Sequence, residues 1–164
     1  MSESPMSEVH LSGGCQCGAV RFRVDQQPEG VHVCHCRMCQ KAVGGPFAVI
    51  CPVDKVNFHV TRGEISWFKS SELANRGFCK NCGTPMTYRH PGGLELAIGT
   101  FDDRSDLAPQ IQVNYDARIP WVETIFDQRI HKEPDFYARQ EAIISFQHPD
   151  YDTAIWPTEG VEHD

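Results

Sequence analysis

The stretch VHVCHCRMCQK, residues 31–41, places three cysteines within six positions, at Cys34, Cys36 and Cys39. A disulfide between Cys34 and Cys36 would close a very small, strained ring. Thiols spaced this closely are instead typical of a metal site or a catalytic centre. We therefore expect the fold to be organised around metal-bound cysteines. The positions of the remaining cysteines indicate how many metal sites the chain can form.

Four more of the eight cysteines form two pairs, Cys15 and Cys17 in GGCQCGA and Cys79 and Cys82 in FCKNCGTP. In the C-x-x-C-G turn, two intervening residues let both sulfurs converge on one ion, and the glycine permits the backbone turn. The eighth, Cys51, lies in the apolar run FAVIC and is predicted to be a small buried core residue.

Zinc is the metal that suits these thiolates, and two zinc ions per chain are expected. Seven clustered sulfurs divide into a closed site of four and a site of three with one open position, the arrangement of zinc enzymes. Two closed sites are the alternative, with Cys51, a His or an Asp as the additional ligand. The spacing also leaves the grouping open, because Cys36 and Cys39 with the Cys79 pair would make a zinc ribbon.

The composition narrows the class of protein further. The chain has 164 residues, enough for one domain, and its 15 Lys and Arg against 22 Asp and Glu give a net charge of -7. This charge disfavours non-specific binding to nucleic acid or anionic lipid. The N-terminal MSESPMSEVH lacks the parts of a secretory signal, and no run reaches the roughly 18 apolar residues of a membrane span. We expect a cytoplasmic protein, where disulfides are disfavoured.

Short segments rich in β-branched and aromatic residues, separated by Gly, Pro, Asn and Asp, predict a mainly β, antiparallel, single-domain fold with little helix. In AVRFRV, Val20, Phe22 and Val24 alternate with Arg21 and Arg23, which indicates a half-buried strand. The predicted strands are residues 19–24, 47–52, 56–61, 64–70, 86–90, 94–101 and 111–115.

The C-terminal part of the chain differs from the rest. Pro134 precedes DFYARQEAII, residues 135–144, the one segment expected to form a helix of useful length. Residues 147–164 are rich in Pro and acidic side chains and are expected to wrap the surface or fray. We therefore expect a zinc-binding domain over residues 10–130 and a C-terminal extension over residues 131–164, packed on the domain or trailing from it.

Four motifs occur in a fixed order: G-x-C-x-C-G-x-V-x-F, then C-H-C-x-x-C-x-K with a downstream G-x-x-F, then F-C-x-x-C-G-T-P, and a P-W at Pro120 and Trp121. From about Gly13 to Asp127, this order resembles the glutathione-dependent formaldehyde-activating enzyme family, whose domain centromere protein V shares. The resemblance implies a zinc-bound antiparallel β "tent". It also implies a zinc-dependent carbon–sulfur lyase, by default one that forms S-(hydroxymethyl)glutathione from glutathione and formaldehyde.

The resemblance also implies a grouping of the cysteines. A structural zinc would be held by Cys15, Cys17, Cys79 and Cys82. A catalytic zinc would be held by Cys34, Cys36 and Cys39, with one position open for the substrate thiol. Such a thiol would lose its proton on binding, because the cation stabilises the anion. Family members often carry a His about nine residues before the Trp, whereas this chain has Gln112.

Other polar residues supply secondary expectations. Arg37, Lys41 and Arg89 could bind the carboxylates of a glutathione-like ligand. His35 points away from the metal if its neighbours point towards it, and is either a proton-shuttling residue or a surface histidine. The remaining strand histidines, His32, His59 and His90, are expected to face solvent rather than bind a metal. The large aromatic residues are expected to be core, with the alternative that one of them lines a ligand pocket: Trp67, Phe68, Phe101 and Trp121.

Two other functions compete with the lyase. A non-catalytic zinc module for a protein or nucleic-acid partner is one, although the acidic balance and the lack of a basic tract count against nucleic acid. A thiol-disulfide oxidoreductase using Cys79 and Cys82 is the other, but the chain lacks the strand–helix alternation that usually hosts such a motif. The sequence leaves the oligomeric state open.

Overall fold

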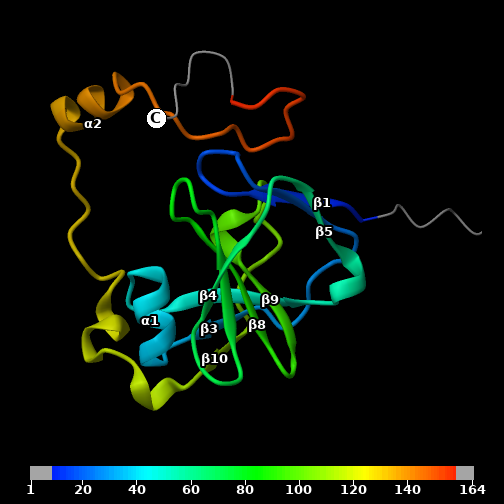
Figure 1. Cartoon of the computed structure of the whole chain (residues 1–164). Helices are drawn as coiled ribbons and strands as arrows, with labels where there is room; N and C mark the ends of the chain where they lie inside the picture. The colour runs from blue at the N-terminus through cyan, green and yellow to red at the C-terminus, as the bar shows by residue number, and fades with distance from the viewer. Residues whose placement is uncertain (1–8, 158–164) are drawn as a thin grey trace, which may run out of the picture.

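The computed structural model describes residues 9–157, which form two β-sheets with a short helix on one of them (Figure 1). A three-stranded sheet has the order β1-β2-β5, and a seven-stranded sheet has the order β10-β3-β4-β9-β8-β7-β6. The strands are β1 (Leu11–Gly14), β2 (Arg21–Val24), β3 (His32–Cys34), β4 (Ala48–Val53), β5 (Phe58–Arg62), β6 (Ser66–Lys69), β7 (Asn75–Phe78), β8 (Pro85–His90), β9 (Gly93–Ala97) and β10 (Ile111–Val113). The helices are α1 (Arg37–Val43) and α2 (Pro134–Glu141), with 3-10 turns η1 (Lys55–Asn57), η2 (Ile98–Thr100), η3 (Tyr115–Ala117) and η4 (Pro120–Thr124).

Strand pairing confirms the mainly β prediction. The pairs in both sheets are antiparallel except that β10 runs parallel to β3. All seven predicted strands are present, within a few residues of their expected ends. The parallel pair adds β10 at the edge next to β3, so the chain after β10 leaves the sheet near the end of β3.

The seven-stranded sheet has a different apolar cluster on each face. Successive residues of a strand point to opposite faces, and Ile50 and Cys51 of β4 show this. Cys51 belongs to the main core, together with Phe22 of β2 and Leu96 of β9. Ile50 belongs to a second cluster, together with Cys34. We call these the inner face, toward the core, and the outer face, on which α1 lies.

Four elements were not predicted: β1, β3, β7 and α1. β3 has only three residues and β7 reads NRGF, so neither shows a hydrophobic period. Helix α1 is capped by the Cys36 side chain, which accepts a hydrogen bond from the Cys39 amide, and ends at Gly44 in the left-handed conformation. A Cys cap replaces the Ser, Thr, Asp or Asn that normally signals a helix start, which is why the pattern did not reveal it.

Arg21 corrects the prediction of a half-buried β2. The apolar residues Phe22 and Val24 are fully buried as expected, but Arg21 is also buried, with 2% of its surface exposed. Its guanidinium forms ion pairs with Asp102 and Asp152. Strand alternation could not reveal this burial, because both carboxylates come from distant loops.

The prediction of core aromatics is right for one residue and wrong for three. Phe101 is buried and packs edge-on against Phe22, with ring centroids 5.3 Å apart. Trp67 and Phe68 are 40% and 61% exposed on β6, and Trp121 is 53% exposed in η4. Trp67 and Phe68 lie on an edge strand with a neighbour on one side only, so less protein covers them.

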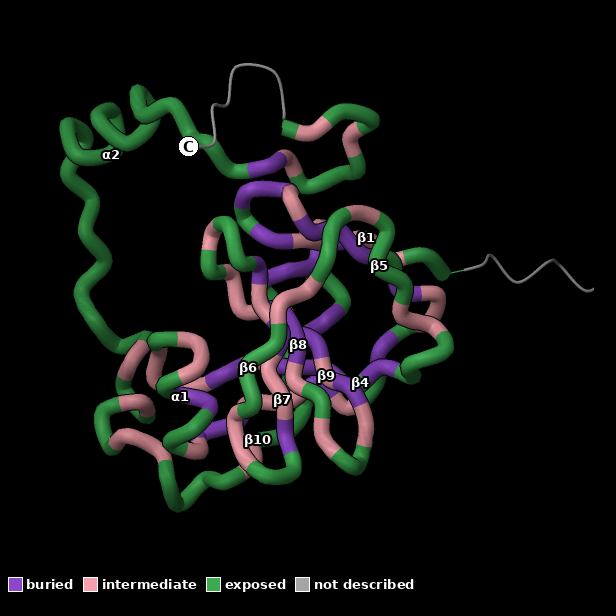
Figure 2. Tube along the Cα trace, viewed as in Figure 1, coloured by how far each residue is buried: buried purple, intermediate pink, exposed green. Residues whose placement is uncertain are grey.

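The C-terminal segment returns to the domain at a point far from where it leaves. Helix α2 confirms the predicted helix, with Pro134 in its first turn. The chain around α2 is exposed throughout, as Figure 2 shows, and the segment beyond it lies next to β1. There the His148 amide donates to the Gln16 carbonyl, and Trp156 Nε1 donates to the Cys17 carbonyl at 2.7 Å. The end of the expected extension, residues 158–164, lies outside the described residues. No helix among residues 9–157 is long and apolar enough to cross a membrane.

Candidate metal centres

Four cysteines from two distant turns meet beside β1. Cys15 and Cys17 lie between β1 and β2, and Cys79 and Cys82 between β7 and β8. Their Sγ atoms all lie within 4.8 Å of one another. The Cys15–Cys17 and Cys17–Cys79 sulfur distances are 3.6 and 3.9 Å. A tetrahedron with Zn–S bonds of 2.3 Å has edges of about 3.8 Å, so the spacing of this four-cysteine cluster fits zinc.

Backbone contacts fix the two halves of the four-cysteine cluster against each other. The Gln16 amide donates to Thr84 Oγ1 at 3.0 Å, and Thr84 Oγ1 lies 3.1 Å from Cys82 Sγ. The turn that carries the second pair is closed by the Gly83 amide, which donates to the Cys79 carbonyl at 2.8 Å. Gly83 has φ +76°, a conformation that strongly favours glycine.

The other group contains three cysteines and lies on the outer face of the seven-stranded sheet. Cys34 ends β3, Cys36 caps α1, and Cys39 lies in the first turn of α1. Their Sγ atoms lie within 4.8 Å of one another. Among the described residues, no fourth His, Cys, Asp or Glu joins this three-cysteine cluster. Cys34 and Cys39 are buried and Cys36 is partly exposed, so solvent reaches the cluster from the Cys36 side.

Each sulfur of the three-cysteine cluster accepts a hydrogen bond from a nitrogen donor. Asn114 Nδ2 donates to Cys34 Sγ at 3.5 Å, the Cys39 amide to Cys36 Sγ at 3.4 Å, and Arg76 Nη2 to Cys39 Sγ at 3.5 Å. Donors of this kind favour the thiolate over the thiol. The cluster is therefore built to hold negative sulfurs.

The pKa values explain why both clusters suit a cation. Burial raises the pKa of Cys39 to about 12, although the hydrogen bond from Arg76 opposes the rise. Burial likewise raises the pKa of Cys15 far above its ordinary value. Burial would also raise the pKa of Cys82, but hydrogen bonds from Thr84 and Cys17 outweigh it and lower the pKa to about 6. Because Cys15 and Cys39 have raised pKa values, all the sulfurs of either cluster ionise together only when a metal ion supplies positive charge.

The structure settles the grouping that spacing left open. Cys36 and Cys39 do not join the Cys79 pair, so the zinc-ribbon arrangement is wrong. Cys51 is fully buried in the main core, as predicted, and is not part of either cluster. The two clusters could hold one metal ion each, in agreement with the expected zinc.

His35 is buried rather than on the surface. Its ring is 1% exposed and lies edge-on to Phe47 and Tyr115. Nε2 lies 2.7 Å from Gln112 Oε1, and with that oxygen as acceptor Nε2 carries the proton. Nδ1 has no hydrogen-bond partner among the described residues. Gln112 therefore positions His35.

The three basic residues expected to bind carboxylates lie in two different places. Arg37 and Lys41 are exposed on α1, four residues apart and on one side of the helix. Arg89 is exposed on β8 and stacks over Trp67, 4.2 Å from the ring centroid. Its neighbour Tyr88 points to the outer face, so Arg89 points away from the three-cysteine cluster.

The strand histidines do not join the metal clusters, but they do not all face solvent. His59 is exposed and pairs with Asp25 at 3.1 Å. His32 is mostly buried, with its side chain 12% exposed, and lies 3.6 Å from Glu95. His90 stacks on Tyr88 and lies 3.2 Å from the same carboxylate. The solvent-facing prediction is therefore wrong for His32. Its ring reaches across β4 toward Glu95 of β9, and both side chains are mostly buried.

Sequence reasoning missed three residues beside the three-cysteine cluster: Asn114, Arg76 and Tyr88. Asn114 has φ 54°, a left-handed conformation that Asn adopts more readily than most residues, and no pattern in IQVNY reveals it. Arg76 stacks over Tyr88, 4.6 Å from the ring centroid. The only available signal for Arg76 was strand pairing between NRGF and MTYRH, and NRGF was not predicted to be a strand.

Comparisons with known proteins give relatives by sequence and a solved structure with a similar fold. A stretch of 82 residues is 30% identical to an uncharacterised lyase of Schizosaccharomyces pombe and covers 49% of this chain and 58% of that one. A stretch of 94 residues is 33% identical to a Halomonas elongata protein provisionally named a glutathione-dependent formaldehyde-activating enzyme. It covers 52% of this chain and 60% of that one. The chain thus spans less than two thirds of both relatives. A solved Rhodobacter sphaeroides protein shares the fold, with a TM-score of 0.52 and 20% identity. The match covers 62% of this chain and 99% of that one.

The family comparison covers both cysteine clusters. The glutathione-dependent formaldehyde-activating enzyme family matches residues 10–117, which is most of the chain and includes every cysteine of the two clusters. The chain belongs to the glutathione-dependent formaldehyde-activating enzyme family.

Proposed function

We propose that this protein is a zinc-dependent carbon–sulfur lyase-type enzyme that acts on a thiol adduct in the cytoplasm, with glutathione and formaldehyde as the default substrates. The family and the relatives named as a lyase and as a formaldehyde-activating enzyme support this class of activity. The reaction joins the thiol sulfur to the aldehyde carbon. The S–H bond and the π bond of the carbonyl group break, a C–S bond forms, and the proton ends on the former carbonyl oxygen, which stays singly bonded to the carbon.

The difference between four and three sulfurs carries the proposal. Cys15, Cys17, Cys79 and Cys82 would close a structural zinc site, whereas Cys34, Cys36 and Cys39 would leave one position for a substrate. Zinc bound there would stabilise the substrate sulfur as a thiolate. The partial exposure of Cys36 supports the proposal that such a position can be reached from solvent.

The protein's own residues would keep the three-cysteine cluster ready for exchange. Three thiolates and a Zn²⁺ ion carry a net charge of -1, and the nearby Arg76 guanidinium balances it. A substrate thiolate would add another negative charge, which favours its release after reaction. Asn114, the Cys39 amide and Arg76 hold the sulfurs in place by hydrogen bonds, so the cluster would not need to rearrange.

The cationic residues on α1 are the proposed contacts for glutathione carboxylates. Arg37 and Lys41 follow Cys36 on the exposed side of the helix, where they could meet a ligand whose sulfur enters the cluster. Arg89, the third residue expected to bind a carboxylate, lies over Trp67, and this position favours a role in covering β6. We also propose that residues 10–130 form the catalytic domain and residues 131–164 an extension of it.

The proposal is tested by NMR exchange spectroscopy on zinc-loaded protein with glutathione and ¹³C-formaldehyde. The enzyme should accelerate exchange between formaldehyde and S-(hydroxymethyl)glutathione well above the buffer rate, and Cys36→Ser should abolish the acceleration. Calorimetry with glutathione separates the rival function, because a zinc module with two closed sites would show no binding. No acceleration in protein that contains two zinc ions per chain would exclude formaldehyde as substrate.

A further inference from the structure

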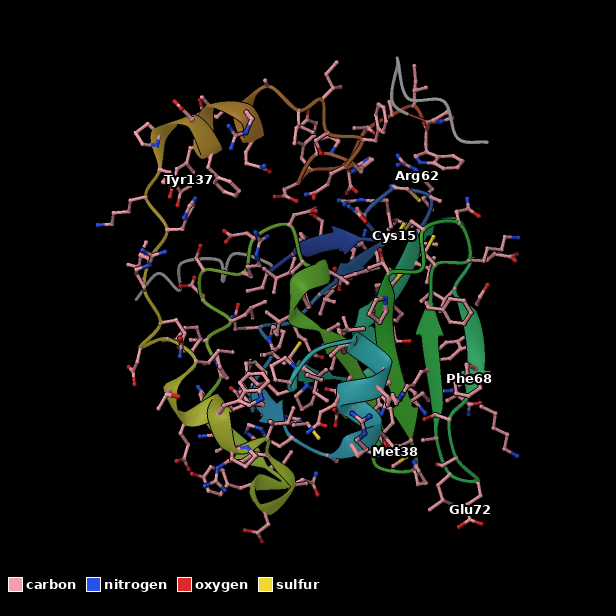
Figure 3. The ribbon with its side chains drawn as sticks, turned by 90° about the vertical axis from the view of Figure 1, so that its left-hand side faces the viewer. Cys15, Met38, Arg62, Phe68, Glu72 and Tyr137 are labelled. Carbon is pink, nitrogen blue, oxygen red and sulfur yellow. The ribbon has the colours of Figure 1, made fainter. Side chains whose placement is uncertain are left out.

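A cavity of about 350 Å³ lies between α1 and the outer face of the seven-stranded sheet. We call it the α1 cavity. Met38 and Ala42 of α1 form one wall, and Ile50, Phe68 and Tyr88 line the sheet side. The strand registers put these residues on one face. Phe68 lies opposite Arg76, and Arg76 lies opposite Tyr88. Tyr88 lies opposite Glu95, and Ile50 lies opposite Ala97, two residues further along β9. Figure 3 shows Met38 on α1 and Phe68 on the neighbouring edge of the sheet.

The α1 cavity adjoins the three-cysteine cluster. Ile50, which lines the cavity, packs in the same apolar cluster as Cys34 and Cys39. Arg76 lines the cavity as well, and its guanidinium reaches Cys39 Sγ. A group bonded to a sulfur that enters the cluster beside Arg76 would therefore have the cavity next to it.

The size and chemistry of the α1 cavity do not match a one-carbon aldehyde. Formaldehyde is little larger than water, which occupies about 30 Å³ in the liquid, and the cavity is roughly ten times larger. Glutathione does not match either, because it carries two carboxylates and an ammonium group, whereas Arg76 is the single charged residue among the described residues that line the cavity. The walls are mainly hydrocarbon and aromatic, as in sites for apolar ligands.

We propose that the α1 cavity binds an apolar substituent of the aldehyde, so that the enzyme acts on thiol adducts of aldehydes with several carbons. This inference rests on the proposed function and names its substrate class. The chain of the aldehyde lies along Ile50 and Phe68, and Arg76 donates a hydrogen bond to the oxygen that receives the thiol proton. The bond changes are those of the formaldehyde reaction, with an alkyl group replacing one hydrogen.

The affinity of S-alkylglutathiones tests this assignment without relying on turnover. Each methylene that becomes buried contributes roughly fourfold in affinity. Zinc-loaded full-length protein should therefore bind S-hexylglutathione at least tenfold more tightly than S-methylglutathione in calorimetry. Equal affinities would overturn the cavity assignment.

Two substitutions examine the cavity itself. Ala42→Phe fills it from α1 and should reduce the S-hexyl preference below threefold, with S-methylglutathione affinity within twofold of wild type. Phe68→Ser, at an exposed position on the rim, should lower the preference without affecting folding. Ala138→Phe on the exposed helix α2 is the matched control and should keep the full preference. A preference that survives both cavity substitutions would contradict the assignment.

Exchange measurements with hexanal and formaldehyde distinguish the two proposals. Acceleration with hexanal that Ala42→Phe removes, with formaldehyde unaffected, supports the inference. Acceleration with formaldehyde alone, together with equal S-alkyl affinities, overturns the inference and leaves the proposed function standing. A strong S-hexyl preference without acceleration of either aldehyde keeps the apolar site but overturns the lyase activity.

Discussion

The Nη2 atom of Arg76 lies 3.5 Å from Cys39 Sγ, while the same guanidinium stacks on the ring of Tyr88. This contact links a sulfur of the three-cysteine cluster to strands β7 and β8, which carry Arg76 and Tyr88. The Arg76 guanidinium also supplies a positive charge, which would balance the net negative charge of a zinc ion held by three thiolates. Arg76 is thus the residue that connects the three-cysteine cluster with the α1 cavity.

Removal of the Arg76 charge should weaken the zinc site of the three-cysteine cluster. Partners that contact metal ligands typically contribute 10- to 100-fold to metal affinity. A competing chelator should therefore remove this zinc from Arg76→Leu at a chelator concentration about 10 to 100 times lower than wild type requires. Arg76→Lys keeps the charge but not the planar stacking on Tyr88. It should lose the zinc at a chelator concentration between those of wild type and Arg76→Leu. Identical chelator curves for all three proteins would contradict this role.

The two cysteine clusters should differ in their contribution to folding. Cys36→Ser should lose one zinc ion per chain and keep its β-sheet circular dichroism, because the three-cysteine cluster lies on the outer face. Cys79→Ser should lose the fold, because the four-cysteine cluster joins two distant turns. Elemental analysis and thermal unfolding provide the measurements. Cys51→Ala is the control, with both metals retained, since Cys51 lies in the core.

Gly18 and Gly83 form a matched pair for testing the C-terminal segment. Their φ angles are +77° and +76°, so a Cβ costs similar backbone strain at both, about 1 to 2 kcal/mol. A Cβ on Gly83 would meet nothing within 4 Å, whereas one on Gly18 would lie 2.1 Å from the His148 ring. Gly18→Ala should therefore cost about 1 to 3 kcal/mol more than Gly83→Ala in urea unfolding. Equal costs would show that residues 147–157 do not cover this turn.

The buried ion pair of Arg21 and Asp102 should make stability fall in acid. Burial would raise the pKa of Asp102, but hydrogen bonds from Arg21 and Ser12 outweigh it and lower the pKa. A carboxyl group whose pKa is lower in the folded state stabilises above its unfolded pKa of about 4, and this stabilisation disappears as the pH falls through the folded value.

Asp102→Asn should therefore destabilise the protein by about 3 kcal/mol at pH 7, because Arg21 then loses its buried partner. The difference between wild type and variant should shrink below about pH 4. Comparing the two proteins at each pH removes the effect of metal release, which acid also promotes. Urea unfolding at several pH values measures the difference, and a constant gap down to pH 3 would contradict the assignment.

Strand prediction succeeded where local pattern decides structure. Segments such as FAVICP and MTYRH are rich in β-branched or aromatic residues, and their strands formed within a few residues of the expected ends. NRGF became β7 only because β6 and β8 flank it with hydrogen-bonding edges. The burial of Arg21 and the exposure of Trp67 likewise depend on partners far along the chain, which no local pattern records.

The sequence by itself determined that clustered thiols would dominate this protein, because cysteine type and spacing restrict which ions the chain can bind. It also determined the mainly β class, since side-chain alternation is a local property of a strand. Only the tertiary structure decided which cysteines share a cluster, and which nitrogen donors and apolar walls surround the group of three. Those relationships depend on contacts such as Arg76 with Cys39, which arise when the sheet forms and α1 packs against its outer face.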